Sequence, residues 1–218
     1  MSDKDHPEDS APHHRDRGMI RGARVAPPRL RADECPIEAI YEEHFNQRQL
    51  CADMDVLAAT TKPRRKLARR VLINLCRDLP AHFADEERGL FPRLRARALP
   101  EDNLEPTLAL LARQHEVARQ AFALLVPALA CMVNGALPAP EDRAALQRLA
   151  SAERRHLIVE NAILLPLARM RLTEDDKRAL MAEICASRRN LPDADAACAG
   201  ALAALPHGAK DDNGGAQG

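Results

Sequence analysis

Aromatic side chains and net charge are both scarce in this sequence. Aromatics make up 2% of the 218 residues, with no tryptophan, whereas alanine and leucine supply most of the apolar positions. This composition favours helices and disfavours sheets. The 32 basic residues balance the 32 acidic ones, so no overall field attracts nucleic acid or an anionic membrane surface. We therefore expect an all-α protein that binds neither nucleic acid nor membrane.

Three kinds of sequence signal are also missing. The six cysteines form no C-x-x-C motif, which argues against a zinc ribbon or a thioredoxin-like site. The N-terminus has no apolar core of an export signal, and no run approaches the ~20 apolar residues of a membrane span. We expect a cytoplasmic protein whose cysteines form no disulfides.

The apolar residues that are present recur at helical spacing in four long segments joined by short connections. This pattern predicts an up-down-up-down four-helix bundle. A shorter fifth helix is expected at about 174–188, with Thr173 as its N-cap and with Leu180, Met181 and Ile184 as its packing face. The four long segments begin near Asp33, Lys62 and Glu105, and after Pro140.

Prolines interrupt three of these segments. Pro80 and Pro92 lie in the second, Pro127 in the third and Pro166 in the fourth. Because proline lacks a backbone donor, a bend or a local break is expected at each.

The ends of the chain lack helical periodicity. Residues 1–32 hold clustered charges and a proline pair, and from Asn190 onward Pro, Asp, Ala and Gly dominate. Such segments bury too little apolar surface to become ordered. We expect disordered tails over 1–32 and 190–218, around one domain over 33–189.

One motif occurs twice. His82 and Glu86 are four residues apart, as are His156 and Glu160, and such pairs lie on one face of a helix. The likeness extends to a leucine, a proline and an arginine at equal offsets after each pair. His44 and His115 are also both followed, four residues later, by Arg-Gln. The sequence therefore indicates an internal duplication.

Each long segment thus places one histidine on its apolar face, and the chain's other histidines lie in the tails. Four neutral imidazoles and two carboxylates suit two iron ions bridged by the carboxylates, although zinc or manganese would also bind such donors. Hydrogen-bonded core residues are the alternative, but without a cation this core would carry a heavy desolvation cost. The six candidate ligands are His44, His82, Glu86, His115, His156 and Glu160.

Three other carboxylates lie close to these motifs. Asp85 and Glu153 could reach the same helix faces as alternative ligands. Glu86 is preferred because its offset from its histidine matches that of Glu160. Glu87 points further round the helix and is expected to be solvated.

Two arginines and a tyrosine each leave two interpretations open. Arg48 and Arg119 lie one turn beyond His44 and His115. They could hydrogen-bond the bridging carboxylates or a bound anionic oxygen species, or point to the surface. Tyr41, close to one turn before His44, could pack in the core or act at the centre as a redox or hydrogen-bonding group.

The run from Asp78 to Pro92, together with the second motif and Leu164–Ala168, resembles the hemerythrin-like (HHE cation-binding) domain family over about residues 36–172. The resemblance implies a four-helix bundle with a carboxylate-bridged non-haem di-iron centre held by the six candidate ligands.

The sequence departs from the oxygen-carrying hemerythrins in two ways. Those have a second histidine four residues from the one on the third helix, where Leu111 or Arg119 stands here. Their last carboxylate is an aspartate five residues after its histidine, whereas Glu160 follows after four. The pattern is more similar to that of iron-sensing and bacterial members of the family, so the resemblance implies di-iron binding more firmly than oxygen carriage.

The expected function is that of a binding protein rather than an enzyme. It would bind or sense dioxygen, nitric oxide or iron, with a small diatomic molecule as its ligand. The alternative is a stress-response enzyme that reduces peroxide or nitric oxide or donates iron for repair, although residues 1–32 do not resemble the cysteine-containing module of the family's repair proteins. A third possibility is a helical interaction module whose site is empty or holds zinc.

Overall fold

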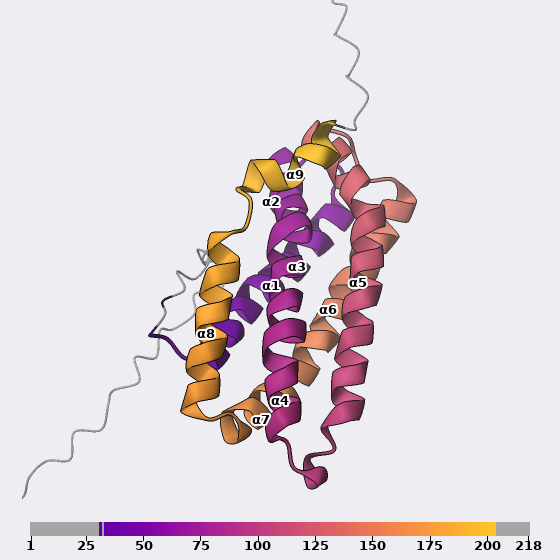
Figure 1. Cartoon of the computed structure of the whole chain (residues 1–218). Helices are drawn as coiled ribbons and strands as arrows, with labels where there is room; N and C mark the ends of the chain where they lie inside the picture. Colours follow the sequence, from indigo (N-terminus) through magenta and orange to yellow (C-terminus); the bar gives the residue numbers. More distant parts are fainter. Residues whose placement is uncertain (1–30, 32, 204–218) are drawn as a thin grey trace, which may run out of the picture.

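The computed structural model describes residues 31 and 33–203 and shows a bundle of helices (Figure 1). The all-α class is confirmed, because the described residues contain no strand. The alternating direction of the four long segments stays a prediction. In chain order these segments are α1 (Pro36–Ala59); α2 (Arg65–Ile73) with η1 (Asn74–Asp78), α3 (Leu79–Asp85), η2 (Glu86–Leu90) and α4 (Phe91–Arg97); α5 (Leu104–Val133); and α6 (Pro140–Val159) with η4 (Glu160–Leu164) and α7 (Leu165–Arg171).

At three of the prolines, the structure has a π-helical turn where a bend or break was expected. Pro80, Pro92 and Pro166 each stand second in the α-helix that follows η1, η2 or η4. The N–H of the residue before each proline bonds the carbonyl five residues back instead of four. Because proline can neither donate a bond nor tolerate the carbonyl four residues earlier, the preceding turn widens. Pro127 lies inside α5 with no π-helical turn.

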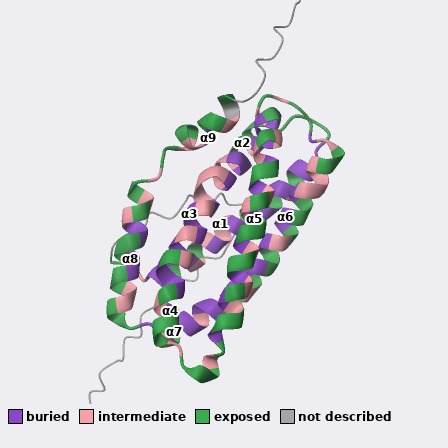
Figure 2. Ribbon diagram, turned by 45° about the vertical axis from the view of Figure 1, so that its right-hand side comes forward, coloured by how far each residue is buried: buried purple, intermediate pink, exposed green. Residues whose placement is uncertain are grey.

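The core consists of two large apolar clusters at different levels of the bundle. One joins the C-terminal half of α1 to α2, α3 and the second half of α5, with Phe83, Leu72 and Leu129 among its buried members. The other joins the start of α1 to α4, α5, α7 and a further helix, α8 (Glu174–Arg189), with Leu94 and Leu164. Figure 2 shows buried residues interspersed with exposed ones along the long segments.

By length and composition alone, α5 is long and apolar enough to cross a membrane. No other helix in the described residues meets this criterion. In the bundle four of its leucines, Leu108, Leu111, Leu125 and Leu129, lie in the core and are at most 1% exposed.

The expected fifth helix is confirmed as α8. Thr173 Oγ1 accepts a hydrogen bond from the Asp176 amide at 3.2 Å, and Asp176 Oδ2 accepts one from the Thr173 amide at 3.0 Å. The expected packing residues Leu180, Met181 and Ile184 are buried.

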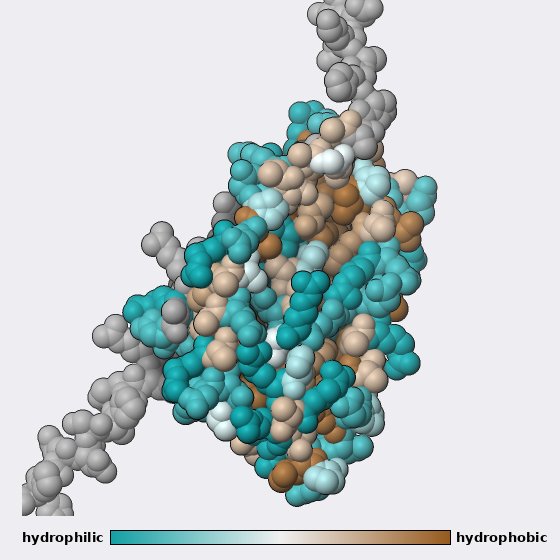
Figure 3. Space-filling view, viewed as in Figure 1, coloured by the Kyte–Doolittle hydropathy of each residue, from teal (hydrophilic) through white to brown (hydrophobic). Residues whose placement is uncertain are grey.

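The expectation of disorder over 190–218 is wrong for part of that range, because α9 occupies Ala194–Ala203. Alanine is the strongest helix former, and Cys198 anchors the helix by being only 2% exposed in the first core cluster. On the face seen in Figure 3, much of the surface is hydrophilic, and an apolar strip lies near α9. The remaining tail positions, 1–30, 32 and 204–218, lie outside the described residues.

Replacing Thr173 by Ala removes the N-cap acceptor of α8. We expect the free energy of unfolding to fall by about 1 kcal/mol, measured by urea denaturation. Thr107→Ala, inside the first turns of α5, is the control and should cost nothing, because alanine is the better helix former. Equal losses in both variants would contradict the capping role.

Candidate metal centre

The structure brings all six predicted ligand residues together in the middle of the bundle. Each is at most 2% exposed. They form two groups that could hold a metal ion, and in each group the potential ligand atoms lie within 4.8 Å of one another. Both groups contain Glu86 and Glu160. One group adds His44 and His82, and the other adds His115 and His156.

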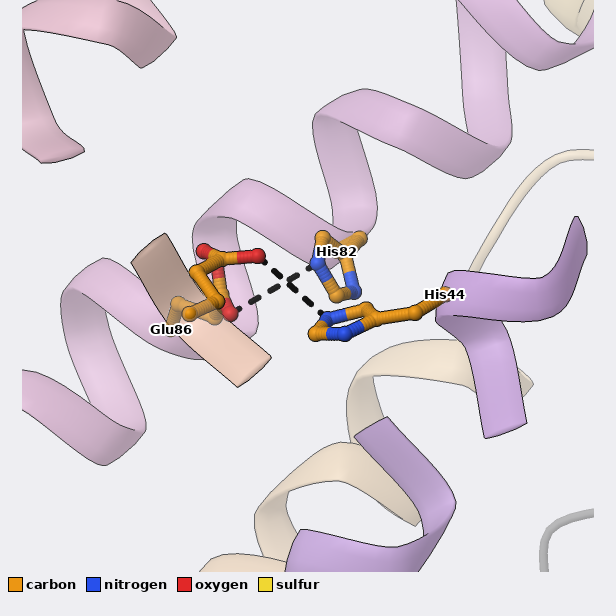
Figure 4. A group of neighbouring side chains, drawn as sticks. His44, His82 and Glu86 are labelled. Carbon is orange, nitrogen blue, oxygen red and sulfur yellow. Dashed lines mark ion pairs between the residues drawn. The ribbon is translucent and has the colours of Figure 1, made fainter. Parts of the chain in front are cut away.

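Glu86 lies between the histidines of one group and those of the other. Its Oε1 is 3.5 Å from His82 Nε2, and its Oε2 is 3.4 Å from His115 Nε2. His44, His82 and Glu86 point toward one another from α1, α3 and the first residue of η2 (Figure 4). The two oxygens of one carboxylate thus face histidines of different groups.

Glu160 repeats this arrangement at the first residue of η4. Its Oε2 is 3.4 Å from His44 Nε2, and its Oε1 is 2.9 Å from His156 Nε2. Burial raises the pKa of Glu160 to about 8. The protonated form is therefore favoured at neutral pH until a cation replaces the proton.

Every imidazole is oriented by a hydrogen bond at its outer nitrogen. An oxygen acceptor at Nδ1 places the proton there and leaves the Nε2 lone pair directed at the centre. The four pairs are His44 with Asn161 Oδ1 (2.9 Å), His82 with Glu43 Oε2 (2.9 Å), His115 with Glu87 Oε1 (2.8 Å) and His156 with Gln114 Oε1 (2.9 Å).

None of these acceptors was predicted from the sequence. Glu87 was expected to be solvated, and this expectation is wrong, because Glu87 is the acceptor of His115. The internal duplication could have pointed to the four acceptors, because they occupy matching positions in the two halves of the sequence. Glu43 and Gln114 immediately precede the histidines of α1 and α5, and Glu87 and Asn161 immediately follow the two carboxylates. Each acceptor serves a histidine on a different helical segment from its own.

Burial keeps three of the four histidines neutral at pH 7. It lowers the pKa of His44 and of His82 to about 4, and it lowers that of His156. Burial also acts to lower the pKa of His115, but the hydrogen bonds of Glu86 and Glu87 and the charges of Glu86 and Glu160 outweigh it, so the pKa is raised. Neutral imidazole is the form that binds metals.

Arg119 has a role that neither earlier interpretation describes. Its Nη2 donates to Glu87 Oε2 at 2.7 Å, so it holds the acceptor of His115 rather than a candidate bridging carboxylate. Although burial would raise the pKa of Glu87, the bonds from Arg119 and His115 lower it. Arg48 is exposed, with its guanidinium 5.3 Å from the Phe45 ring, which agrees with the surface interpretation.

The alternative carboxylates lie outside both groups. Asp85 turns to α8, where it accepts from Ser187 Oγ at 2.8 Å. Glu153 is 3% exposed, and burial raises its pKa. Tyr41 packs edge-on against the His44 ring, at 6.4 Å between ring centroids. The guanidinium of Arg169 lies over the Tyr41 ring. This environment supports a packing role for Tyr41.

The donor set fits a metal ion. Both oxygens of Glu86 and of Glu160 are buried and have no hydrogen-bond partner among the described residues, and the same holds for Nε2 of His44 and of His82. Buried carboxylates without partners are strongly unfavourable. Two nitrogens and two carboxylates in each group are donors that iron, manganese and zinc all accept.

Glu160→Gln should stabilise the metal-free protein more as the pH rises. Between pH 4.5 and about 8 the unfolded chain releases the Glu160 proton while the folded chain keeps it, so wild-type stability falls across this window. Glutamine does not titrate. In the presence of a chelator, we expect the difference in unfolding free energy between variant and wild type to grow by more than about 1.4 kcal/mol from pH 5 to 8.

The control for that experiment is Glu42→Gln, on the exposed face of α1. The fall in stability from pH 5 to 8 should persist in this variant, because Glu160 is retained. A difference that is flat with pH for Glu160→Gln would contradict the raised pKa.

The comparisons with known proteins agree with this geometry. The family model described as the hemerythrin HHE cation binding domain matches residues 35–205. That range contains all the candidate ligands, and it extends beyond the expected 36–172 through α8 and α9. No curated protein matches the chain. The chain belongs to the hemerythrin HHE cation-binding domain family.

Proposed function

We propose that the six buried residues hold two iron ions and that the chain uses them to bind or sense a small diatomic molecule, dioxygen or nitric oxide. The convergence of four oriented imidazoles on two unpartnered carboxylates supports this proposal above all. Glu86 and Glu160 would bridge the ions, since each already lies between the two groups.

Each residue of the site has a definite task in this proposal. His44 and His82 would hold one ion, and His115 and His156 the other. Iron with imidazole and carboxylate ligands supplies open coordination positions for a small ligand and can change oxidation state. The four acceptors at Nδ1 fix the ring orientations before any metal arrives, which reduces the reorganisation that binding requires.

The surroundings of the site favour a small ligand. Phe83 stacks on the His115 ring at 3.9 Å between centroids and is fully buried. Two surface clefts reach the site from different sides. One, of about 960 Å³, has His82 in its lining, and the other, of about 920 Å³, has His156. Because all six candidate ligands are at most 2% exposed, the enclosed centre favours a diatomic molecule over a larger substrate.

Anaerobic purification followed by metal counting tests the proposal. We expect about two irons per chain, and an optical spectrum that changes on addition of dioxygen or nitric oxide. His156→Ala should lose at least about one iron per chain, because it removes one of four nitrogen donors.

The control is His207→Ala, which changes a histidine outside the described residues and should keep the wild-type iron content. A wild-type chain that binds zinc but no iron would contradict the iron assignment. Steady turnover of peroxide or nitric oxide, lost in His156→Ala, would replace a binding function by an enzymatic one.

A further inference from the structure

Helix α8 is connected to the candidate metal centre by a short chain of hydrogen bonds. Arg188, in its last turn, donates from Nη2 to Glu43 Oε2 at 2.9 Å. The same oxygen is 2.9 Å from His82 Nδ1. One carboxylate on α1 therefore joins a candidate ligand on α3 to a helix that lies outside the four long segments.

The guanidinium of Arg188 has a second acidic partner, because Asp85 Oδ2 lies 2.9 Å from the same nitrogen. Ser187 Oγ donates to the other oxygen of Asp85. The side chains of Arg188, Glu43 and Asp85 are only 16%, 17% and 7% exposed. Removing the arginine would leave two largely buried carboxylates without their cation, which is costly in a medium of low dielectric constant.

The two halves of the centre differ in which helix supplies the cation that holds the acceptor at Nδ1. The acceptor of His115 is Glu87, and its cation is Arg119 on α5, itself one of the four long segments. The remaining two histidines have neutral amides as acceptors. Within the described part of the chain, α8 supplies a side-chain hydrogen bond to an Nδ1 acceptor only on the side of His44 and His82.

We propose that docking of the last turn of α8 depends on whether a metal ion occupies the position formed by His44 and His82. The inference rests on the proposed metal binding. An ion on His82 Nε2 would make the Nδ1–H a stronger donor and fix the ring, so that Glu43 is held in the position that Arg188 requires. Linkage makes the effect reciprocal, because docking of α8 then raises the affinity of that position.

The rest of α8 is fixed by other contacts. Asp176 in its first turn accepts from Arg97, and Glu183 forms two bonds with Arg93, at 2.8 and 2.7 Å. Metal loss is therefore expected to loosen the end of the helix and not its start. The loosened part would include the connection to α9, which carries the metal-dependent change to the surface.

Hydrogen exchange measured by mass spectrometry tests this coupling on the full chain without metal, with Fe(II) under anaerobic conditions, and with Zn(II). In the wild type, metal loading should slow amide exchange over residues 184–191 by at least about fivefold. Arg188→Met should abolish this metal-dependent change and weaken the binding of one ion only. Arg188→Lys keeps the charge and should restore part of the effect.

Two variants serve as matched controls. Glu183→Gln removes the other ion pair of α8 near this end and should keep the metal-dependent protection. Arg119→Met removes the equivalent cation on the other half, and it should weaken one ion while leaving the exchange of α8 responsive to metal.

Loaded wild-type protein whose α8 exchanges as fast as in the metal-free protein would overturn the inference. So would metal-dependent protection that survives unchanged in Arg188→Met. A chain that binds zinc but not iron would refute the iron assignment, while the zinc series still decides the coupling. A chain that binds neither metal would refute both.

Discussion

The structure depends on burying four imidazoles and two carboxylates at the centre of a helical bundle. Such a group is unfavourable unless each polar atom has a partner. The outer nitrogens meet this requirement with four side-chain oxygens. Within the described chain, both oxygens of Glu86 and of Glu160, and Nε2 of His44 and of His82, do not meet it. Two apolar clusters pack against this polar layer, and a bound cation would supply the partners that it lacks.

The prolines set where the two carboxylates stand. Pro92 and Pro166 each force the preceding turn into a π-helix, and those turns begin at Glu86 and Glu160. One extra residue in a turn rotates everything after it by about 100° relative to a regular helix. A carboxylate can therefore face the centre while the leucines that follow still face the core. The proline in the motif is thus part of the construction of the site.

The sequence was sufficient for features that depend on spacing along one helix and insufficient for those that depend on packing between helices. The ligand pairs follow from a separation of four residues, and the cap of α8 follows from Thr173. The acceptor Glu43 was missed because its partner, His82, lies on another segment and becomes a neighbour only in the bundle. Helix α9 was missed because its alanines give no apolar stripe, although Cys198 secures it to the core.

The duplicated halves match in their candidate ligands but not in what supports them. Each proposed metal position has one histidine held by a carboxylate and one held by an amide, so the charge around the two positions is similar. The difference lies in the cation behind each carboxylate. Arg119 belongs to α5, one of the four long segments of the bundle, whereas Arg188 belongs to α8, which packs on the bundle from outside. A peripheral helix can undock at a smaller free-energy cost than a central one. The metal position of His44 and His82 is therefore the one whose occupancy can change with solution conditions without loss of the fold.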